Sequence, residues 1–153
     1  MAAPTQLEIS LPGGRRVDAR VRSHVIRTDQ PVNNKGEDSA PSPFELFLAS
    51  IGTCAGIFVQ GFCAARGIPT ENVRIVERTT FSDEGVLSGV DLELQLPPEF
   101  PERYVAAVQS VVEQCSVKKA IAAQPPITVR STAAARQPTP HTPANSDEAR
   151  PPR

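Results

Sequence analysis

The sequence has few of the groups on which nucleic-acid and metal recognition depend. Its 153 residues include no Trp, one Tyr and two His, and they contain no Cys-x-x-Cys pair. Sixteen Lys and Arg are balanced by 17 Asp and Glu, which gives a net charge of −1. Aromatic rings that would stack on bases are scarce, and no excess of positive charge attracts nucleic acid or an anionic membrane. We therefore expect neither of those partners and no metal site.

The N-terminal stretch MAAPTQLEISLPGG lacks the basic start and the apolar core of a secretion signal. The sequence thus indicates a cytoplasmic protein. In a reducing compartment, three cysteines are not expected to form a static disulfide framework. Cys54, Cys63 and Cys115 are therefore core residues, metal ligands or redox groups.

The last residues, 133–153, contain no Val, Ile, Leu or aromatic residue and are rich in Pro. Such a segment cannot bury enough apolar surface to offset the entropy lost on ordering. We expect a disordered, Pro-rich tail over 133–153. The remainder, 1–132, is the length of one folded domain with a core of its own.

Hydrophobic periodicity predicts an α+β fold in the order β-β-α-β-β-α-α-β, with a mainly antiparallel sheet. Gly and Pro mark the turns between the strands. The expected elements are strands at 5–11 and 15–26, a helix from 43 to about 66, strands at 73–81 and 86–96, a helix with its apolar stripe at 104–115, a short helix at 116–124 and a last strand at 127–132.

The most informative segment is SPFELFLASIGTCAGIFVQGFCAARG, residues 42–67. Ser42 as N-cap, Pro43 at the first helical position and Glu45 three residues after the cap predict a helix start. The segment is long enough to span a bilayer. However, it carries an acid and a glutamine, and its ends have neither an aromatic belt nor a charge asymmetry. We interpret it as a buried helix of a folded domain.

A helix that is apolar on every side needs cover on every side. The sheet supplies one side, and a domain of this size has little left for the other. The pattern therefore predicts a two-fold homodimer. Gly52, Gly56 and Gly61 each cost about 1 kcal/mol of helix stability relative to Ala, so their density indicates close packing of helices.

The three thiols differ in where they lie on the predicted helices. Cys54 and Cys63 are nine residues apart, which places them on opposite faces of one helix, so they cannot bond each other. Cys63 is interpreted as a small core residue. Cys54 and Cys115 point into the same interior from different helices, which leaves open whether they are core residues or a functional pair.

The segment APSPFELFLASIGTCAG, followed about sixty residues later by CSVKKAI and a short terminal strand, resembles the OsmC/Ohr family. The family is named for osmotically induced protein C and the organic hydroperoxide resistance proteins. The resemblance runs from about residue 15 to 132. It implies an α+β homodimer whose subunits intertwine around two central helices, in agreement with the covered helix inferred above.

The resemblance also implies a chemistry. Cys54 would attack the terminal oxygen of an organic or lipid hydroperoxide and become a sulfenic acid, and Cys115 would condense with it to a disulfide. No cofactor is implied. A cellular dithiol or a lipoylated protein would restore both thiols. An apolar pocket, lined from FLASI, AGIFV and the facing subunit, would favour organic peroxides over hydrogen peroxide.

One position departs from the family's peroxidase branches, in which an acid directly follows the helix-opening proline and pairs with an arginine beside the reactive sulfur. Here Phe44 holds that place and the acid is Glu45. Glu45 is nine residues from Cys54, about 13 Å along the helix axis. It would therefore reach the thiol only across a dimer, and we interpret it first as a capping-box residue.

The sequence does not fix the cation that would hold Cys54 as a thiolate. Arg15, Arg27, Lys118 and Lys119 are all candidates. A buried thiol without a cation nearby has a raised pKa and reacts slowly. Two functions therefore remain open, a two-cysteine organic hydroperoxide reductase and a non-catalytic homodimer of the same fold that holds a small apolar ligand between its subunits.

Overall fold

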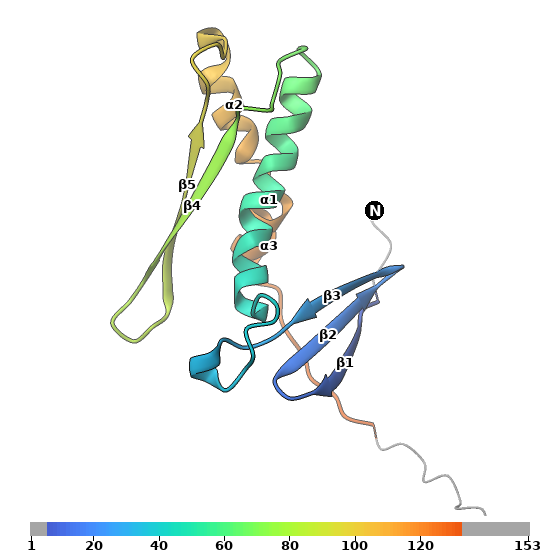
Figure 1. Ribbon diagram of the computed structural model, residues 1–153. Coiled ribbons are helices and arrows are strands. Elements are labelled where there is room, and N and C mark those ends of the chain that lie inside the picture. The colour runs from blue at the N-terminus through green and yellow to red at the C-terminus, as the bar shows by residue number, and fades with distance from the viewer. Residues whose placement is uncertain (1–5, 133–153) are drawn as a thin grey trace, which may run out of the picture.

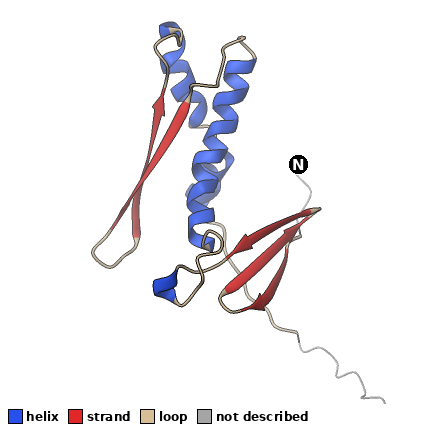
Figure 2. Cartoon of the chain, in the orientation of Figure 1, coloured by secondary structure: helices blue, strands red, loops and turns tan. Residues whose placement is uncertain are grey.

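The structure is a computed structural model that describes residues 6–132, so the tail predicted at 133–153 lies outside the described residues. The chain has the α+β class that the sequence predicts, with an antiparallel hairpin alongside one long helix and a separate three-stranded antiparallel sheet near the start of that helix (Figures 1 and 2). Its elements are β1 (Glu8–Gly13), β2 (Arg16–Val21), β3 (His24–Thr28), η1 (Val32–Asn34), α1 (Pro43–Ala64), β4 (Arg74–Phe81), β5 (Leu87–Gln95), η2 (Glu102–Tyr104), α2 (Val105–Val112) and α3 (Ser116–Ala123).

Helix α1 begins at the capping box that the sequence predicts. The backbone N–H of Glu45 donates to Ser42 Oγ at 3.3 Å, and the backbone N–H of Ser42 donates to Glu45 Oε2 at 2.7 Å. These bonds hold the pKa of the Glu45 carboxyl below its ordinary value. The helix ends before Gly67, whose φ of 64° suits a residue without a side chain. Both predicted ends are confirmed.

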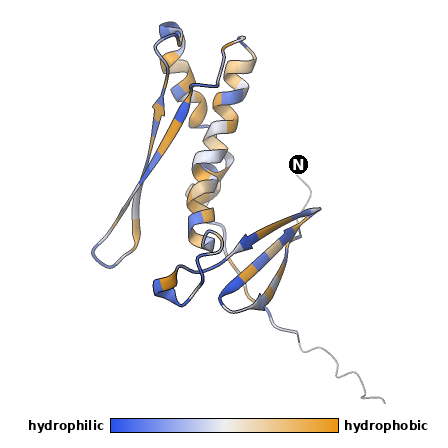
Figure 3. Ribbon diagram, viewed as in Figure 1, coloured by the Kyte–Doolittle hydropathy of each residue, from blue (hydrophilic) through white to orange (hydrophobic). Residues whose placement is uncertain are grey.

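One face of α1 is buried and the other is open. Ile51, Ala55, Val59, Phe62 and Cys63 follow the spacing of one helical face and lie in the core. On the open side the helix still carries apolar residues (Figure 3). By length and composition alone, the helix could also cross a membrane. The capping box and the buried face identify it instead as the core helix of this fold, covered by its own chain on one side only.

The β4–β5 hairpin and α2 cover the buried face of α1. The two strands of the hairpin pair antiparallel, for example at Thr79 and Val90. This pairing confirms the strands predicted at 73–81 and 86–96. Val108 and Val112 of α2 are buried in the same cluster. The core therefore lies between α1, the hairpin and α2, and it fixes α1, which carries Cys54, against the helix that precedes Cys115.

The N-terminal sheet differs from the prediction. The strand expected at 15–26 is two strands, β2 and β3, joined by a two-residue turn at Arg22 and Ser23, with Val21 paired to His24. Arg22 has a φ of 54°, in the left-handed region. Apolar and polar residues alternate straight through this turn, so the period-two pattern gave no sign of it. The sheet has the order β1-β2-β3.

The strand predicted at 127–132 does not form among the described residues. After α3 the chain continues without strand pairing, and the side chains of Ile127 and Val129 are each 92% exposed. Alternation of apolar and polar residues is necessary for a half-buried strand, but a strand also needs a neighbouring edge. Within residues 6–132 this segment pairs with no strand.

A tight loop connects β3 to α1. The buried Asp29 carboxylate accepts hydrogen bonds from the backbone N–H groups of Gln30, Glu37 and Ser39 and from Ser39 Oγ, at 2.7 to 3.2 Å. These donors lower the pKa of Asp29 from 3.8 to about 2. At Gly36 a side chain would begin 1.7 Å from the Gln30 carbonyl oxygen, so only Gly fits. The loop thereby fixes where α1 starts.

Candidate functional site

The N-terminus of α3 meets α1 at Cys54. The chain turns between α2 and α3, where the backbone N–H of Cys115 donates to Val112 O at 3.2 Å, and Cys115 becomes the N-cap of α3. The Cys115 side chain is fully buried, whereas Cys54 remains partly exposed. Two thiols that are 61 positions apart in the chain are thus brought together, one shielded and one accessible from outside.

Hydrogen bonds at this junction favour the thiolate of Cys54. The largest contribution is from the Cys115 thiol, followed by the backbone N–H of Val117, and the N–H of Ser116 adds to them. Together they lower the pKa of Cys54, although its partial burial opposes the shift. A thiolate is the nucleophilic form of cysteine, so this geometry prepares Cys54 to attack.

Beside the Cys115 thiol, the donors to Cys54 are backbone N–H groups at the start of a helix, and none is a cationic side chain of the described residues. Ser116 and Val117 are the first two residues of α3, and their N–H groups have no partner within the helix. The start of a helix carries a partial positive charge that attracts an anion. Lys118, one of the cations considered above, donates instead to Glu113 Oε2 at 2.6 Å. Among residues 6–132, the groups that lower the pKa of Cys54 are the Cys115 thiol and these backbone amides, and a cation at Cys54 stays a prediction.

Cys63 lies apart from this pair, as its helical position predicts. It is fully buried in the core beside Val59. Burial raises the pKa of its thiol, and the charge of Arg66 only partly opposes that effect. Cys63 is therefore a poor nucleophile and a core residue.

Glu45 stays at the start of α1, with one carboxylate oxygen bonded to the Ser42 N–H. It lies nine residues from Cys54 on the same helix, so the two do not approach each other within one chain. The capping interpretation is confirmed. A role for Glu45 across a dimer stays a prediction.

An apolar groove runs between α1 and α2. It has a volume of about 630 Å³. Ile57 and Phe58, one turn after Cys54, line one end together with Gln114, the residue before Cys115, and Arg66 lies at the other end. We call it the α1–α2 groove. Ile57 and Phe58 of the AGIFV segment form part of its wall, whereas no residue of FLASI does, and periodicity alone gave no sign of the α2 residues or of Arg66. The pocket predicted beside the thiols stays a prediction.

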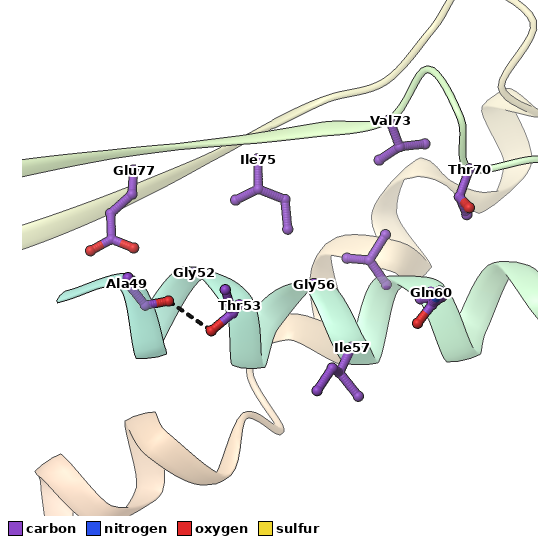
Figure 4. A pocket seen from close by; sticks show the side chains of 11 residues that line it. Ala49, Gly52, Thr53, Gly56, Ile57, Gln60, Thr70, Val73, Ile75 and Glu77 are labelled. Atoms are coloured by element: carbon purple, nitrogen blue, oxygen red, sulfur yellow. Dashed lines mark hydrogen bonds between the residues drawn. The ribbon is translucent and has the colours of Figure 1, made fainter. Parts of the chain in front are cut away.

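A second groove lies between α1 and β4 and has a volume of about 590 Å³ (Figure 4). Glu77 points from β4 towards α1, and its Oε2 lies 2.7 Å from where a side chain at Gly52 would begin. The other oxygen of Glu77, Oε1, is buried without a hydrogen-bond partner in the structure. The alternating pattern of β4 gave no sign of Glu77, because an acid in such a strand is expected to face solvent.

Fold and site together define a class of protein: an α+β domain with a long central helix that presents one cysteine to a second at the start of a late helix. A family model for OsmC-like protein matches residues 36–130, more than half of the chain. The chain therefore belongs to the OsmC-like protein family. No curated protein matches it in sequence.

Solved structures show the same fold. A protein of Psychrobacter arcticus assigned to osmotic stress induction and detoxification is 20% identical with a TM-score of 0.66, over 78% of this chain and 90% of that one. The organic hydroperoxide resistance protein OsmC of Legionella pneumophila is 20% identical with a TM-score of 0.57, over 79% and 90%. An OsmC-like protein of Mycoplasma pneumoniae is 13% identical with a TM-score of 0.65, over 80% and 89%.

Proposed function

We propose that the protein is a thiol-dependent peroxidase that reduces organic hydroperoxides through Cys54 and Cys115. The observation that carries the proposal is the contact between these two thiols at the start of α3, where hydrogen bonds lower the pKa of Cys54. The family supports it too, since one structural neighbour is an organic hydroperoxide resistance protein.

In the first step, the Cys54 thiolate attacks the terminal oxygen of the hydroperoxide. A sulfur–oxygen bond forms, the oxygen–oxygen bond breaks, and the alkoxide leaves and takes up a proton to become an alcohol. Sulfur is oxidised by two electrons and the peroxide is reduced by two. Cys54 is now a sulfenic acid, and the backbone N–H groups of Ser116 and Val117 that held the thiolate remain beside it.

In the second step, the Cys115 sulfur attacks the sulfenic sulfur, a disulfide forms and water leaves. Because Cys115 already touches Cys54, resolution precedes further oxidation to the sulfinic acid. Full burial shields Cys115 itself from peroxide. An external dithiol or a lipoylated protein then exchanges with the disulfide and returns both thiols. No cofactor takes part in this scheme.

We further propose that the working unit is a homodimer. The exposed apolar face of α1 is a surface that this chain leaves uncovered. A second copy would cover that face, and it would form the outer wall of the site. The activity and the assembly are separate parts of the proposal, and different measurements test them.

Counting free thiols during titration with cumene hydroperoxide tests the activity. The reduced chain has three free cysteines. One equivalent of peroxide is expected to remove two of them, leaving Cys63, and to lower the intact mass by two hydrogens. Cys54→Ser is expected to abolish the loss. Cys115→Ser is expected to stop at a sulfenic acid, which dimedone traps.

Cys63→Ser is the matched control, because it changes a thiol of the same helix that faces the core. It is expected to lose both remaining thiols at the wild-type rate. The non-catalytic alternative, a homodimer that holds a small apolar ligand between its subunits, predicts no thiol loss at one equivalent of peroxide. That result would end the peroxidase proposal.

A further inference from the structure

A small cavity lies at the C-terminal end of α1, between the loop that follows this helix and the loop that leads from β5 into η2 (Figure 1). We call it the loop cavity. It has a volume of about 240 Å³, and neither Cys54 nor Cys115 lines it. Pockets for drug-sized ligands have volumes of about 300–1,000 Å³, so this cavity suits a smaller metabolite.

Prolines restrict both loops of the loop cavity. Pro69 lies in one loop and Pro97 and Pro101 lie in the other, and each fixes its own backbone φ. The carbonyl oxygens of Pro97 and Pro101 accept hydrogen bonds from the backbone N–H groups of Phe100 and Tyr104, both at 2.9 Å. Phe100 is buried and gives the cavity an apolar wall. The loops therefore need little further ordering when a ligand binds.

Two guanidinium groups lie over one aromatic ring at this cavity. The Cζ atoms of Arg66 and Arg103 are 5.5 Å and 4.7 Å from the centroid of the Tyr104 ring, so they are at most about 10 Å apart. Arg66 is also held by Phe62, whose ring centroid lies 3.7 Å from Cζ and whose carbonyl oxygen accepts from Nη1 at 3.1 Å. Within residues 6–132 neither arginine forms an ion pair. Stacked guanidinium groups with N–H groups left over suit a carboxylate.

Two carboxylates line the same cavity without pairing with the arginines. Glu71 and Glu99 both belong to its lining, and among the described residues neither forms an ion pair. Asn72 Nδ2 donates to Glu99 Oε1 at 3.4 Å, a contact that joins the two loops. A simple anion in the cavity would be repelled by the carboxylates, and a simple amine by the guanidinium groups. A ligand that carries both charges complements both pairs.

We propose that the loop cavity binds a small zwitterion, an α-amino acid with an apolar side chain. The carboxylate of this ligand binds Arg66 and Arg103. Its ammonium group binds Glu99, and its side chain packs against Phe100 and the prolines. The site is separate from the proposed peroxidase, because Arg66 is twelve residues after Cys54, about 18 Å along the helix axis.

Titration of the reduced protein with L-leucine, followed by ¹H–¹⁵N NMR, tests the inference. Two analogues each lack one charge, since 4-methylpentanoate has no ammonium group and 3-methylbutylamine has no carboxylate. Leucine is expected to bind more tightly than either analogue, because it alone satisfies both pairs of charged side chains. The amide signals that move are expected to be those of the two loops.

Variants of the charged residues test each half of the ligand. Arg103→Gln is expected to raise the Kd of leucine and of 4-methylpentanoate about three- to tenfold and not to weaken 3-methylbutylamine, because it removes a partner of the carboxylate. Glu99→Gln is expected to weaken leucine and 3-methylbutylamine and not 4-methylpentanoate. Loss of the folded loops would weaken all three ligands, so the selectivity of each variant separates lost contacts from lost structure.

Arg78→Gln is the matched control. Arg78 is an exposed arginine of β4 that pairs with Glu93 and does not line the loop cavity. This variant is expected to bind leucine as the wild type does. The absence of saturable shifts with leucine, or a Kd that neither Arg103→Gln nor Glu99→Gln changes, overturns the site. Equal affinities for leucine and 4-methylpentanoate overturn the zwitterion as its ligand.

Discussion

At the scale of single residues, the position of Cys54 relative to the start of α3 decides its chemistry. The sequence predicts that Cys54 and Cys115 share an interior, because each lies on the apolar stripe of its own helix. It does not reveal what stabilises the thiolate, because backbone N–H groups are the same at every residue. The N–H groups of Ser116 and Val117 point to the Cys54 sulfur because of the turn before α3, which no local pattern specifies.

The lowered pKa of Cys54 predicts its reactivity as a function of pH. The rate of alkylation by iodoacetamide follows the thiolate fraction, so it rises as the pH increases through the pKa. We expect the midpoint for Cys54 to lie below that of an unperturbed cysteine. Cys115→Ala is expected to raise the midpoint, because it removes the strongest donor to the Cys54 sulfur.

Cys115→Ser is the control for that series, since a hydroxyl still donates a hydrogen bond. Its midpoint is expected to lie nearer to that of the wild type than to that of Cys115→Ala. The modified residue is identified by mass spectrometry of the peptide that contains Cys54. One common midpoint for all three proteins would show that Cys115 does not tune its neighbour.

At the scale of elements, the start of α1 carries a measurable share of stability. Ser42 and Glu45 each bond the backbone of the other. Ser42→Ala removes one half of this capping box and is expected to lower the free energy of unfolding by about 1 kcal/mol in urea titrations of the reduced protein. Ser42→Asp keeps an oxygen acceptor and is expected to lose much less. Equal losses would place the stability of this helix end elsewhere.

The elements that the sequence predicts well are those whose signals are local. The capping box of α1, the Gly at its end and the alternation of β4 and β5 all lie within a few residues of the structure they specify. The turn at Arg22 has neither Gly nor Asn. The alternation of apolar and polar residues therefore predicted one strand where there are two. The segment 127–132 has the pattern of a strand, but its pairing depends on a neighbour that no local pattern specifies.

At the scale of the whole molecule, the open apolar face of α1 is the feature that indicates a partner subunit. The side chain of Ile57 is 69% exposed in the middle of the longest helix. The β1–β2–β3 sheet and the β4–β5 hairpin are separate and retain free edges within the described chain (Figure 1). Such surfaces mark an interface when they lie together on a folded domain. A second copy of the chain is the simplest occupant.

The proposed homodimer predicts that a charge on α1 separates the subunits. Ile57→Glu is expected to shift the protein from dimer to monomer in sedimentation equilibrium, because a carboxylate at the centre of an apolar interface loses its hydration. Val32→Glu is the matched control, since Val32 is 71% exposed in η1 and away from this helix. It is expected to remain dimeric. A wild type that sediments as a monomer at all concentrations would contradict the assembly.

The junction of Cys54 with α3 links catalysis to the integrity of a helix. The sulfur anion accepts from Val117 and Ser116, so it serves as the terminal acceptor for the first turn of α3, a place that an N-cap side chain ordinarily takes. The proposed oxidation of Cys54 would remove that negative charge. If it occurs, the helix start that carries Cys115 is expected to loosen, and its amide hydrogens are expected to exchange with solvent faster in the oxidised protein than in the reduced one.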